Sequence, residues 1–267
     1  MADFLYGLVL GIVQGLAEFL PVSSSGHLEL AKYIFGDRSL GEESLLLSVI
    51  LHVGTMLSTV VVFRKEILEL LRGIFKPVNN EEKQYALKII VSMIPAAIIG
   101  VGFEDILETF FESKIHLVSF FLICTAGLLW LSGRASRANQ PLDYKNAFII
   151  GVAQAVAILP GISRSGSTIA TSVLLGIDKA QAARFSFLMV LPLILGKVAK
   201  DILDGAFAET TLSPTVAITG VITSFIVGIF ACTVMINLVK KSKLDYFAYY
   251  CLVVGSFGLI YYFTQSA

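Results

Sequence analysis

The sequence predicts an all-α integral membrane protein made of two inverted-topology repeats. Hydrophobic residues make up 56% of the 267 residues and charged residues only 15%, whereas soluble domains carry about 25% charged residues. The apolar residues also lie in continuous runs that approach the roughly 20 residues a helix needs to cross a bilayer. A membrane barrel would instead alternate in polarity over segments of about 10 residues, so we expect helices.

Six apolar runs are long enough to be transmembrane helices. The predicted spans are, in order, 45–63, 86–103, 115–132, 185–203, 216–239 and 244–263. The fourth is interrupted by Lys197 and Asp201, which are four residues apart and are therefore expected to pair with each other on one helix face.

Two other apolar segments break before they could cross the membrane. Residues 4–22 end at a proline and a run of serines, and residues 147–162 end at a Pro-Gly pair. Each is followed by a second apolar piece that is too short to cross alone. This pattern predicts two re-entrant helical hairpins, at residues 4–35 and 147–177.

The two hairpins resemble each other in sequence. "GIVQGLAEFLPVSSSGH" (11–27) aligns without a gap with "GVAQAVAILPGISRSGS" (151–167). The identical pairs are Gly11/Gly151, Gln14/Gln154, Ala17/Ala157, Ser23/Ser163, Ser25/Ser165 and Gly26/Gly166. Because internal repeats define architecture, we expect repeat one at 1–133 and repeat two at 140–267, within one membrane domain. Each repeat has one hairpin followed by three spans.

Three spans per repeat place the second repeat upside down, and the charges of the connecting segments agree with this orientation. Lys and Arg collect on the cytoplasmic side of short loops. Residues 64–88 carry six of them and 133–146 and 240–245 carry three each, whereas 104–114 and 197–215 carry one and two. The first hairpin is therefore expected to enter from outside and the second from the cytoplasm. Broken helices of inverted repeats meet near the middle of the bilayer.

The turns of the two hairpins concentrate polar chemistry inside the membrane. Each turn precedes a helix start, where free N–H groups and the positive end of the helix dipole favour an anion. Arg164 adds a positive charge whose planar fork suits phosphate oxygens. The other groups expected to face the anion are Ser23, Ser24, Ser25, Gly26, Ser163, Ser165, Gly166 and Ser167.

Three further side chains beside the first turn extend this chemistry. Gln14 and Glu18 are four residues apart and share a helix face. A carboxylate beside a phosphate needs a bridging cation, so we expect Mg²⁺ or Ca²⁺. His27 lies within one helical turn of the serines and is a candidate general acid, general base or nucleophile. The whole set suits phosphoryl transfer from a lipid-borne phosphate.

These residues resemble those of a known family, the undecaprenyl-diphosphate phosphatases of the bacitracin-resistance type. The family is marked by a Glu/Gln-x-x-x-Glu pattern running into Pro-Val-Ser-Ser-(Ser/Thr)-Gly-His, and by a later Pro-Gly-x-Ser-Arg-Ser-Gly segment. Here the segments read "QGLAEFLPVSSSGH" (14–27) and "PGISRSGST" (160–168). The resemblance implies an enzyme of the bacterial plasma (inner) membrane that hydrolyses undecaprenyl diphosphate to the monophosphate. Its active site would open to the extracytoplasmic side, and its product would return to cell-wall synthesis.

The resemblance also implies roles for individual residues. Glu18 and Gln14 would hold or orient the divalent cation, and many members have glutamate at the position of Gln14. Either Ser24 or His27 would attack the terminal phosphorus, and the sequence leaves that choice open. The residues that would clamp the diphosphate are Arg164, Ser163, Ser165 and Thr168.

A second function class is a lipid-phosphate transporter or flippase that uses the same diphosphate-binding site. It is compatible with inverted repeats, because transporters share them. The expected partners are a polyprenyl diphosphate and membrane lipids, and the sequence leaves open whether the chain forms a homodimer. The net charge of zero argues against nucleic acid as a partner.

Other polar side chains of the spans receive simpler interpretations. His52 lies in the middle of a span, where it either faces the cavity or has a satisfied packing role, and we favour packing. His116 lies at the end of a span and is expected at the interface. Three tyrosines near the inner end of the last span are expected to join the interfacial aromatic belt: Tyr246, Tyr249 and Tyr250.

Overall fold

The structure is a computed structural model. It describes residues 2–36, 41–78, 80–103, 107, 110, 114–135, 139–205, 212–240 and 244–265. Within these residues the regular elements are eleven α-helices, and the all-α prediction is confirmed for them. Most of the predicted loop 104–114, and residues 241–243 of the predicted loop 240–245, lie outside the described residues.

Six helices are long and apolar enough to cross a membrane, one for each predicted span. They are α3 (Gly41–Val62), α5 (Glu81–Gly102), α7 (Ile115–Gly133), α10 (Lys179–Leu203), α12 (Pro214–Lys240) and α13 (Leu244–Gln265). Helix α10 begins earlier than predicted because the side chain of Asp178 accepts hydrogen bonds from the first N–H groups of the helix. Within α10, Lys197 donates to Asp201 at 2.6 Å, as expected.

Four shorter helices form two consecutive pairs. The first pair is α1 (Ala2–Ala17) and α2 (Ser24–Ile34), and the second pair is α8 (Tyr144–Val156) and α9 (Arg164–Leu174). A helix of 16 or fewer residues is too short to cross the hydrocarbon core alone. One more helix, α4 (Arg64–Ile74), precedes α5.

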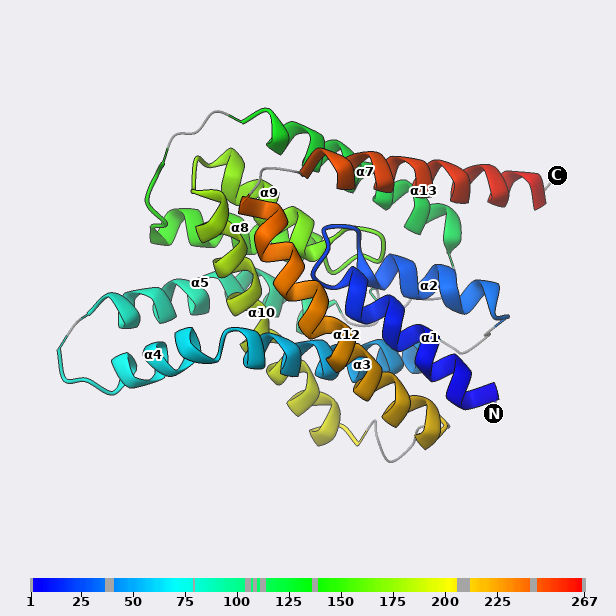
Figure 1. The fold of residues 1–267 in the computed structure, drawn as a ribbon, viewed down its shortest axis with the longest axis horizontal. Coiled ribbons are helices and arrows are strands. Elements are labelled where there is room, and N and C mark those ends of the chain that lie inside the picture. The colour runs from blue at the N-terminus through cyan, green and yellow to red at the C-terminus, as the bar shows by residue number, and fades with distance from the viewer. Residues whose placement is uncertain are drawn as a thin grey trace.

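The short helices pack along spans that come from distant parts of the sequence (Figure 1). Helix α1 packs along α12, and α8 packs along α5. Helix α3 also packs on α12, while α7 packs along α13 and also contacts α9 and α2. The turn between α1 and α2 and the turn between α8 and α9 meet among these spans.

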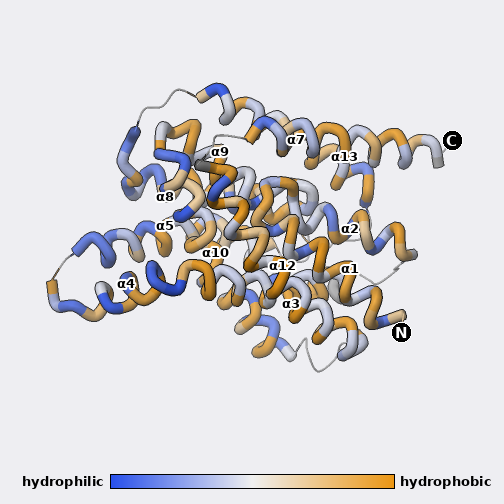
Figure 2. Tube along the Cα trace, in the orientation of Figure 1, coloured by the Kyte–Doolittle hydropathy of each residue, from blue (hydrophilic) through white to orange (hydrophobic). Residues whose placement is uncertain are grey.

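The outer surfaces of the spans are apolar, as a lipid-facing wall requires. On α5, the side chains of Ile90, Ile94 and Ile98 lie on one face and are 56%, 45% and 61% exposed. An apolar surface of this extent is unfavourable in water and favourable in lipid. Figure 2 shows the apolar colouring along the spans and a hydrophilic end formed by α4 and the start of α5. The fold is that of a multi-pass membrane protein.

Candidate active site

The first turn (residues 18–27) joins α1 to α2 and includes the first residues of α2. The hydroxyl of Ser23 accepts a hydrogen bond from the N–H of Gly26 at 3.2 Å, which caps α2. Ser23 has a φ of 70°. This left-handed conformation is uncommon for residues other than glycine and costs about 1–3 kcal/mol. Backbone strain of this kind gathers at functional sites.

The second turn (residues 158–167) joins α8 to α9, includes the first residues of α9 and contacts the first turn. Ser163 caps α9 through its hydroxyl, and the left-handed residue here is Gly161, with a φ of 102°. The N–H of Gly161 donates to the hydroxyl of Ser23 at 3.2 Å. A Cβ atom added to Gly26 would lie 2.9 Å from the Cα of Gly161, so this crossing excludes a side chain at position 26. The structure therefore brings together the two turns that the sequence singled out.

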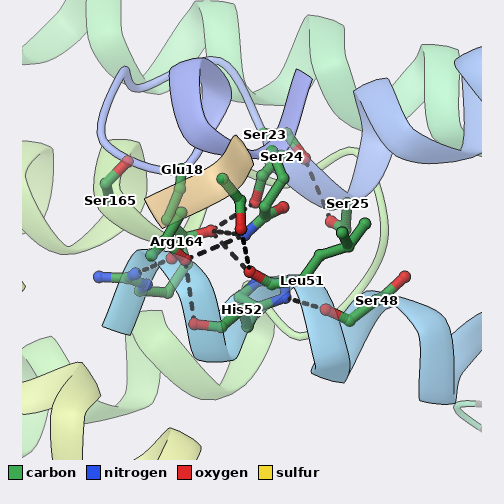
Figure 3. A network of polar contacts seen from close by, with 12 residues as sticks. Glu18, Ser23, Ser24, Ser25, Ser48, Leu51, His52, Arg164 and Ser165 are labelled. Atoms are coloured by element: carbon green, nitrogen blue, oxygen red, sulfur yellow. Dashed lines mark hydrogen bonds and ion pairs between the residues drawn. The ribbon is translucent and has the colours of Figure 1, made fainter. Parts of the chain in front are cut away.

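Glu18 is buried at the centre of the polar site and gathers partners from several helices (Figure 3). Its Oε1 atom pairs with the guanidinium Nη2 of Arg164, at the start of α9. Its Oε2 atom accepts from the Ser24 hydroxyl at 2.7 Å and from the Gln14 amide at 3.1 Å. The Nε2 atom of His52, on α3, lies 3.1 Å from the same oxygen. The two turns thus contribute opposite charges to one cluster.

His52 belongs to this cluster, which is the alternative to the packing role that we favoured. Its Nδ1 atom lies 2.6 Å from the carbonyl oxygen of Ser48, and its Nε2 atom faces Glu18. Because the carbonyl oxygen can only accept, Nδ1 carries a proton, and Nε2 is the nitrogen that meets the Glu18 carboxyl group. The available signal was an ionisable residue in the middle of a span, which by default marks a functional position in a membrane protein.

His27 lies in the first turn but faces α13. Its Nδ1 atom is 2.8 Å from the carbonyl oxygen of Ser23, and its Nε2 atom is 2.9 Å from the hydroxyl of Tyr250. The two rings also stack, with centroids 5.5 Å apart. Since the carbonyl can only accept, Nδ1 carries the proton and Nε2 is left to accept from Tyr250. We expected Tyr250 in the interfacial belt, and sequence alone does not distinguish it from Tyr246 or Tyr249.

The predicted clamp residues of the second turn support Arg164 and each other. Arg164 Nη1 donates to the carbonyl oxygen of Ser186, on α10, at 3.2 Å. The Thr168 hydroxyl donates to the Arg164 carbonyl oxygen at 2.9 Å and lies 2.6 Å from the Ser186 hydroxyl. Ser165 donates to the carbonyl oxygen of Leu20 in the first turn at 3.2 Å. Ser186 was not predicted, because a serine inside an apolar span carries no distinctive signal.

Gln14 and Glu18, the two residues expected to hold a cation, are in direct contact. Among the described residues, no three His, Cys, Asp or Glu side chains gather as a metal cluster. The Gln14 amide nitrogen bonds to Glu18 and to the Thr55 hydroxyl, whereas its Oε1 atom is buried without a hydrogen-bond partner. A free amide oxygen beside a carboxylate fits Mg²⁺ or Ca²⁺ when substrate phosphates and water complete the coordination.

Fold and site together define a multi-pass helical membrane protein with a charged cluster buried where two broken segments meet. Comparison with known families makes the assignment specific. The model of the family described as bacitracin resistance protein BacA matches residues 7–257. The chain belongs to this family, and the resemblance seen in the sequence is confirmed.

Individual relatives match over almost the whole chain. A protein of Christiangramia forsetii is 57% identical over 263 residues, which cover 98% of this chain and 100% of the relative. A protein of Bacteroides fragilis is 48% identical over 257 residues, covering 95% and 96%. A protein of Methanosphaera stadtmanae is 38% identical over 278 residues, covering 97% and 98%. All three are named undecaprenyl-diphosphatase.

Proposed function

We propose that this chain is a membrane hydrolase that converts undecaprenyl diphosphate to undecaprenyl phosphate and inorganic phosphate. The observation that carries this proposal is the ion pair between Arg164 and Glu18, with the Ser24 hydroxyl on the same carboxylate. Arg164 can bind an anion, the Ser24 hydroxyl can act as nucleophile, and the Glu18 carboxylate, which contacts both, can accept the hydroxyl proton. The relatives named undecaprenyl-diphosphatase indicate the substrate.

The diphosphate binds between the starts of α2 and α9. Helix starts offer N–H groups and a positive dipole end to phosphate, and here two of them meet. The guanidinium of Arg164 exchanges Glu18 for phosphate oxygens, because its planar fork accommodates two of them at once. This exchange leaves Glu18 free of its guanidinium partner and therefore a better acceptor for the proton of Ser24.

Ser24 is the nucleophile that the geometry favours. Its oxygen attacks the terminal phosphorus, and its proton passes to Glu18, whose Oε2 atom is 2.7 Å away. The bond between that phosphorus and the bridging oxygen breaks, and undecaprenyl phosphate leaves. Water then attacks the phosphorus of the phosphoserine, and the bond between phosphorus and the Ser24 oxygen breaks. Glu18 returns its proton to the Ser24 oxygen, and inorganic phosphate leaves with the protons of the water. Arg164 balances the charge of the phosphoryl oxygens in both steps.

His27 is the alternative nucleophile. Its reacting atom would be Nε2, which lies 2.9 Å from the Tyr250 hydroxyl and would first have to give up that contact. Ser24 needs no such change, because its hydroxyl already donates to a carboxylate. The different partners of the two residues therefore favour Ser24 as nucleophile, with His27 as an acid or base for the incoming water.

A divalent cation fits beside these residues. Glu18 and the free Oε1 atom of Gln14 would hold Mg²⁺ or Ca²⁺ together with the substrate. When bound, the ion would draw negative charge from the phosphoryl oxygens.

We also propose the inverted-repeat architecture, with re-entrant hairpins at 4–35 and 147–177. Two matched sets of helix contacts support it. The first hairpin packs on the second span of repeat two, α12, and the second hairpin packs on the second span of repeat one, α5. A Cβ atom added to Gly11 would lie 2.7 Å from the Gly220 carbonyl oxygen, and one added to Gly151 would lie 2.3 Å from that of Ser92. Gly11 and Gly151, an identical pair in the repeat alignment, thus permit α1 to approach α12 and α8 to approach α5 closely.

The site is proposed to open to the extracytoplasmic side of the bacterial plasma membrane. Support for this orientation of the chain comes from the hydrophilic end formed by α4 and the start of α5 (Figure 2). The positive-inside rule places this end in the cytoplasm. Its basic residues are Arg64, Lys65, Arg72, Lys76, Lys83 and Lys88. The alternative of a lipid-phosphate transporter gains no support from the relatives, which are named as phosphatases.

The direct test measures inorganic phosphate released from undecaprenyl diphosphate by the purified chain in detergent, with and without a chelator. We expect release by the wild type, and its loss in Glu18→Ala, His27→Ala and Arg164→Ala. Lys200→Ala is the matched control, because Lys200 forms a surface pair with Asp204 at 2.7 Å, outside the site. No release by the wild type, or full release by all three site variants, would overturn the proposal.

A further inference from the structure

One face of α3 carries a column of polar side chains in an otherwise apolar span. The members are spaced by four, four and three residues and therefore share a helix face. Every member contacts a polar side chain of the first hairpin. The contacts are Ser44 with Glu29 and Lys32, Ser48 with Lys32, His52 with Glu18, and Thr55 with Gln14. We call Ser44, Ser48, His52 and Thr55 the α3 column.

The end of the α3 column away from Glu18 contacts a buried ion pair on α2. Glu29 and Lys32 lie on α2, are 1% and 2% exposed, and approach to 3.0 Å. Lys32 also donates to the carbonyl oxygen of Ser44 at 2.9 Å, to its hydroxyl at 2.6 Å and to the Ser48 hydroxyl at 3.3 Å. A buried pair is tolerated when its remaining hydrogen bonds are satisfied, and α3 supplies them. The pair thus fixes α2, which begins at Ser24, against α3.

His52 links this anchor to the proposed chemistry. Ser48 receives a hydrogen bond from Lys32 at its hydroxyl and one from His52 Nδ1 at its carbonyl oxygen. The other nitrogen of His52 reaches Glu18 at 3.1 Å, as Figure 3 shows. With its ring held at both ends, His52 has one orientation, and so has the carboxylate that accepts from Ser24.

We propose that His52 is a positioning residue for Glu18, and that the Glu29–Lys32 pair keeps the α3 column in register with the first hairpin. This inference rests on the proposed phosphatase function. His52 acts through Glu18, by fixing where the carboxylate meets the Ser24 hydroxyl. A displacement of a catalytic group by about 1 Å can lower the rate on the order of 10²-fold, so positioning at this contact affects turnover.

The test compares three variants of the full chain in the phosphate-release assay. His52→Leu removes both hydrogen bonds, and His52→Gln keeps a side-chain N–H that reaches toward Glu18. Ser58→Ala is the matched control, because Ser58 is a buried polar residue of the same helix that bonds to Gly54 and to Phe225 on α12. Kinetic constants are measured with undecaprenyl diphosphate, and folding is checked by thermal unfolding in the same detergent.

We expect His52→Leu to lower kcat by about 100-fold with KM changed by no more than about threefold. His52→Gln should recover kcat to within about tenfold of the wild type, and Ser58→Ala should keep it. A purely structural role would lower the unfolding temperature and leave kcat per folded molecule unchanged. If His52→Leu does not fold, His52→Asn replaces it, since its shorter side chain cannot reach both partners.

Two results overturn the inference. One is a kcat for His52→Leu, or for His52→Asn, equal to that of the wild type. The other is a kcat for His52→Gln equal to that of His52→Leu or of its Asn replacement, because positioning requires a side-chain N–H that reaches Glu18. Failure of the proposed function looks different, since the wild type itself would then release no phosphate from undecaprenyl diphosphate.

Discussion

The first turn and the second turn are held by the same internal hydrogen bonds. In each, a capping serine accepts from the N–H of a glycine three residues later, at 3.2 Å for Ser23 and 3.0 Å for Ser163. In each, the capping hydroxyl lies 3.4 Å from the hydroxyl two residues further on. These bonds use three of the pairs that are identical in the sequence: Ser23/Ser163, Ser25/Ser165 and Gly26/Gly166.

The proposed chemistry lies at the positions where the two turns differ. Position 24 is serine where the second turn has Arg164, and position 18 is glutamate where the second turn has an isoleucine. His27 corresponds to a serine in the second turn. The identical residues therefore build the turn, and the differing residues supply the nucleophile, the carboxylate, the histidine and the guanidinium. Neither turn holds the site alone, so the two must meet for it to exist.

The largest effect is expected from breaking the ion pair between the turns. Arg164→Gln should lower phosphate release by about 10³-fold and the free energy of unfolding by about 3 kcal/mol, because Glu18 stays buried without its guanidinium. The double variant Glu18→Gln/Arg164→Gln should regain most of that stability and none of the activity. Phosphate release and unfolding in detergent measure the two separately.

Recovery of phosphate release in the double variant would contradict the proposal that the residues differing between the turns supply the chemistry. It would show that the pair only holds the turns together, and that the chemistry lies elsewhere.

The sequence predicted the spans and the two turns better than the residues that other helices contribute to the site. Hydropathy located all six spans, and the internal repeat located both turns, because these features repeat along the chain. His52 and Ser186 were missed for a different reason. Each comes from a span far from the turns, and only the packing of α3 and α10 brings it to Glu18 or Arg164.

Tyr250 is another partner of the first turn that the sequence did not single out. Its neighbours in sequence are tyrosines too, and helix phase alone does not say which of them meets α2. The hydrogen bond to His27 exists because α13 places one tyrosine of the group at this position. Local patterns therefore predict local structure, while partners contributed by distant helices require the fold.

A second prediction separates serines within the first turn. Ser24→Ala should reduce phosphate release by about three orders of magnitude, as expected for loss of a nucleophile. Ser25→Ala should reduce it by no more than about tenfold, because the Ser25 hydroxyl makes only a 3.4 Å contact with Ser23 in the described structure. Single-turnover assays with undecaprenyl diphosphate would also test for a phosphoserine. An active Ser24→Ala together with an inactive His27→Ala would transfer the nucleophile to His27.

The smallest effect on activity is expected from replacing the capping serines, Ser23 and Ser163. The two replacements should differ in the unfolding free energy that they cost. The Ser23 hydroxyl accepts from both Gly26 and Gly161, whereas the Ser163 hydroxyl accepts from Gly166. Ser23→Ala therefore leaves two buried N–H groups without that acceptor and should cost about 2 kcal/mol of unfolding free energy. Ser163→Ala leaves one and should cost about 1 kcal/mol.

Unfolding of the two cap variants in one detergent measures this difference directly, with the wild type as reference. Equal losses would mean that the bond from Gly161 to Ser23 contributes nothing, and that the turns are held together by other contacts such as the Arg164–Glu18 pair and the bond from Ser165 to Leu20. A larger loss in Ser23→Ala would instead show that the strained serine of the first turn joins the two halves of the site. Its φ of 70° would then be the conformation that aims one hydroxyl at both turns.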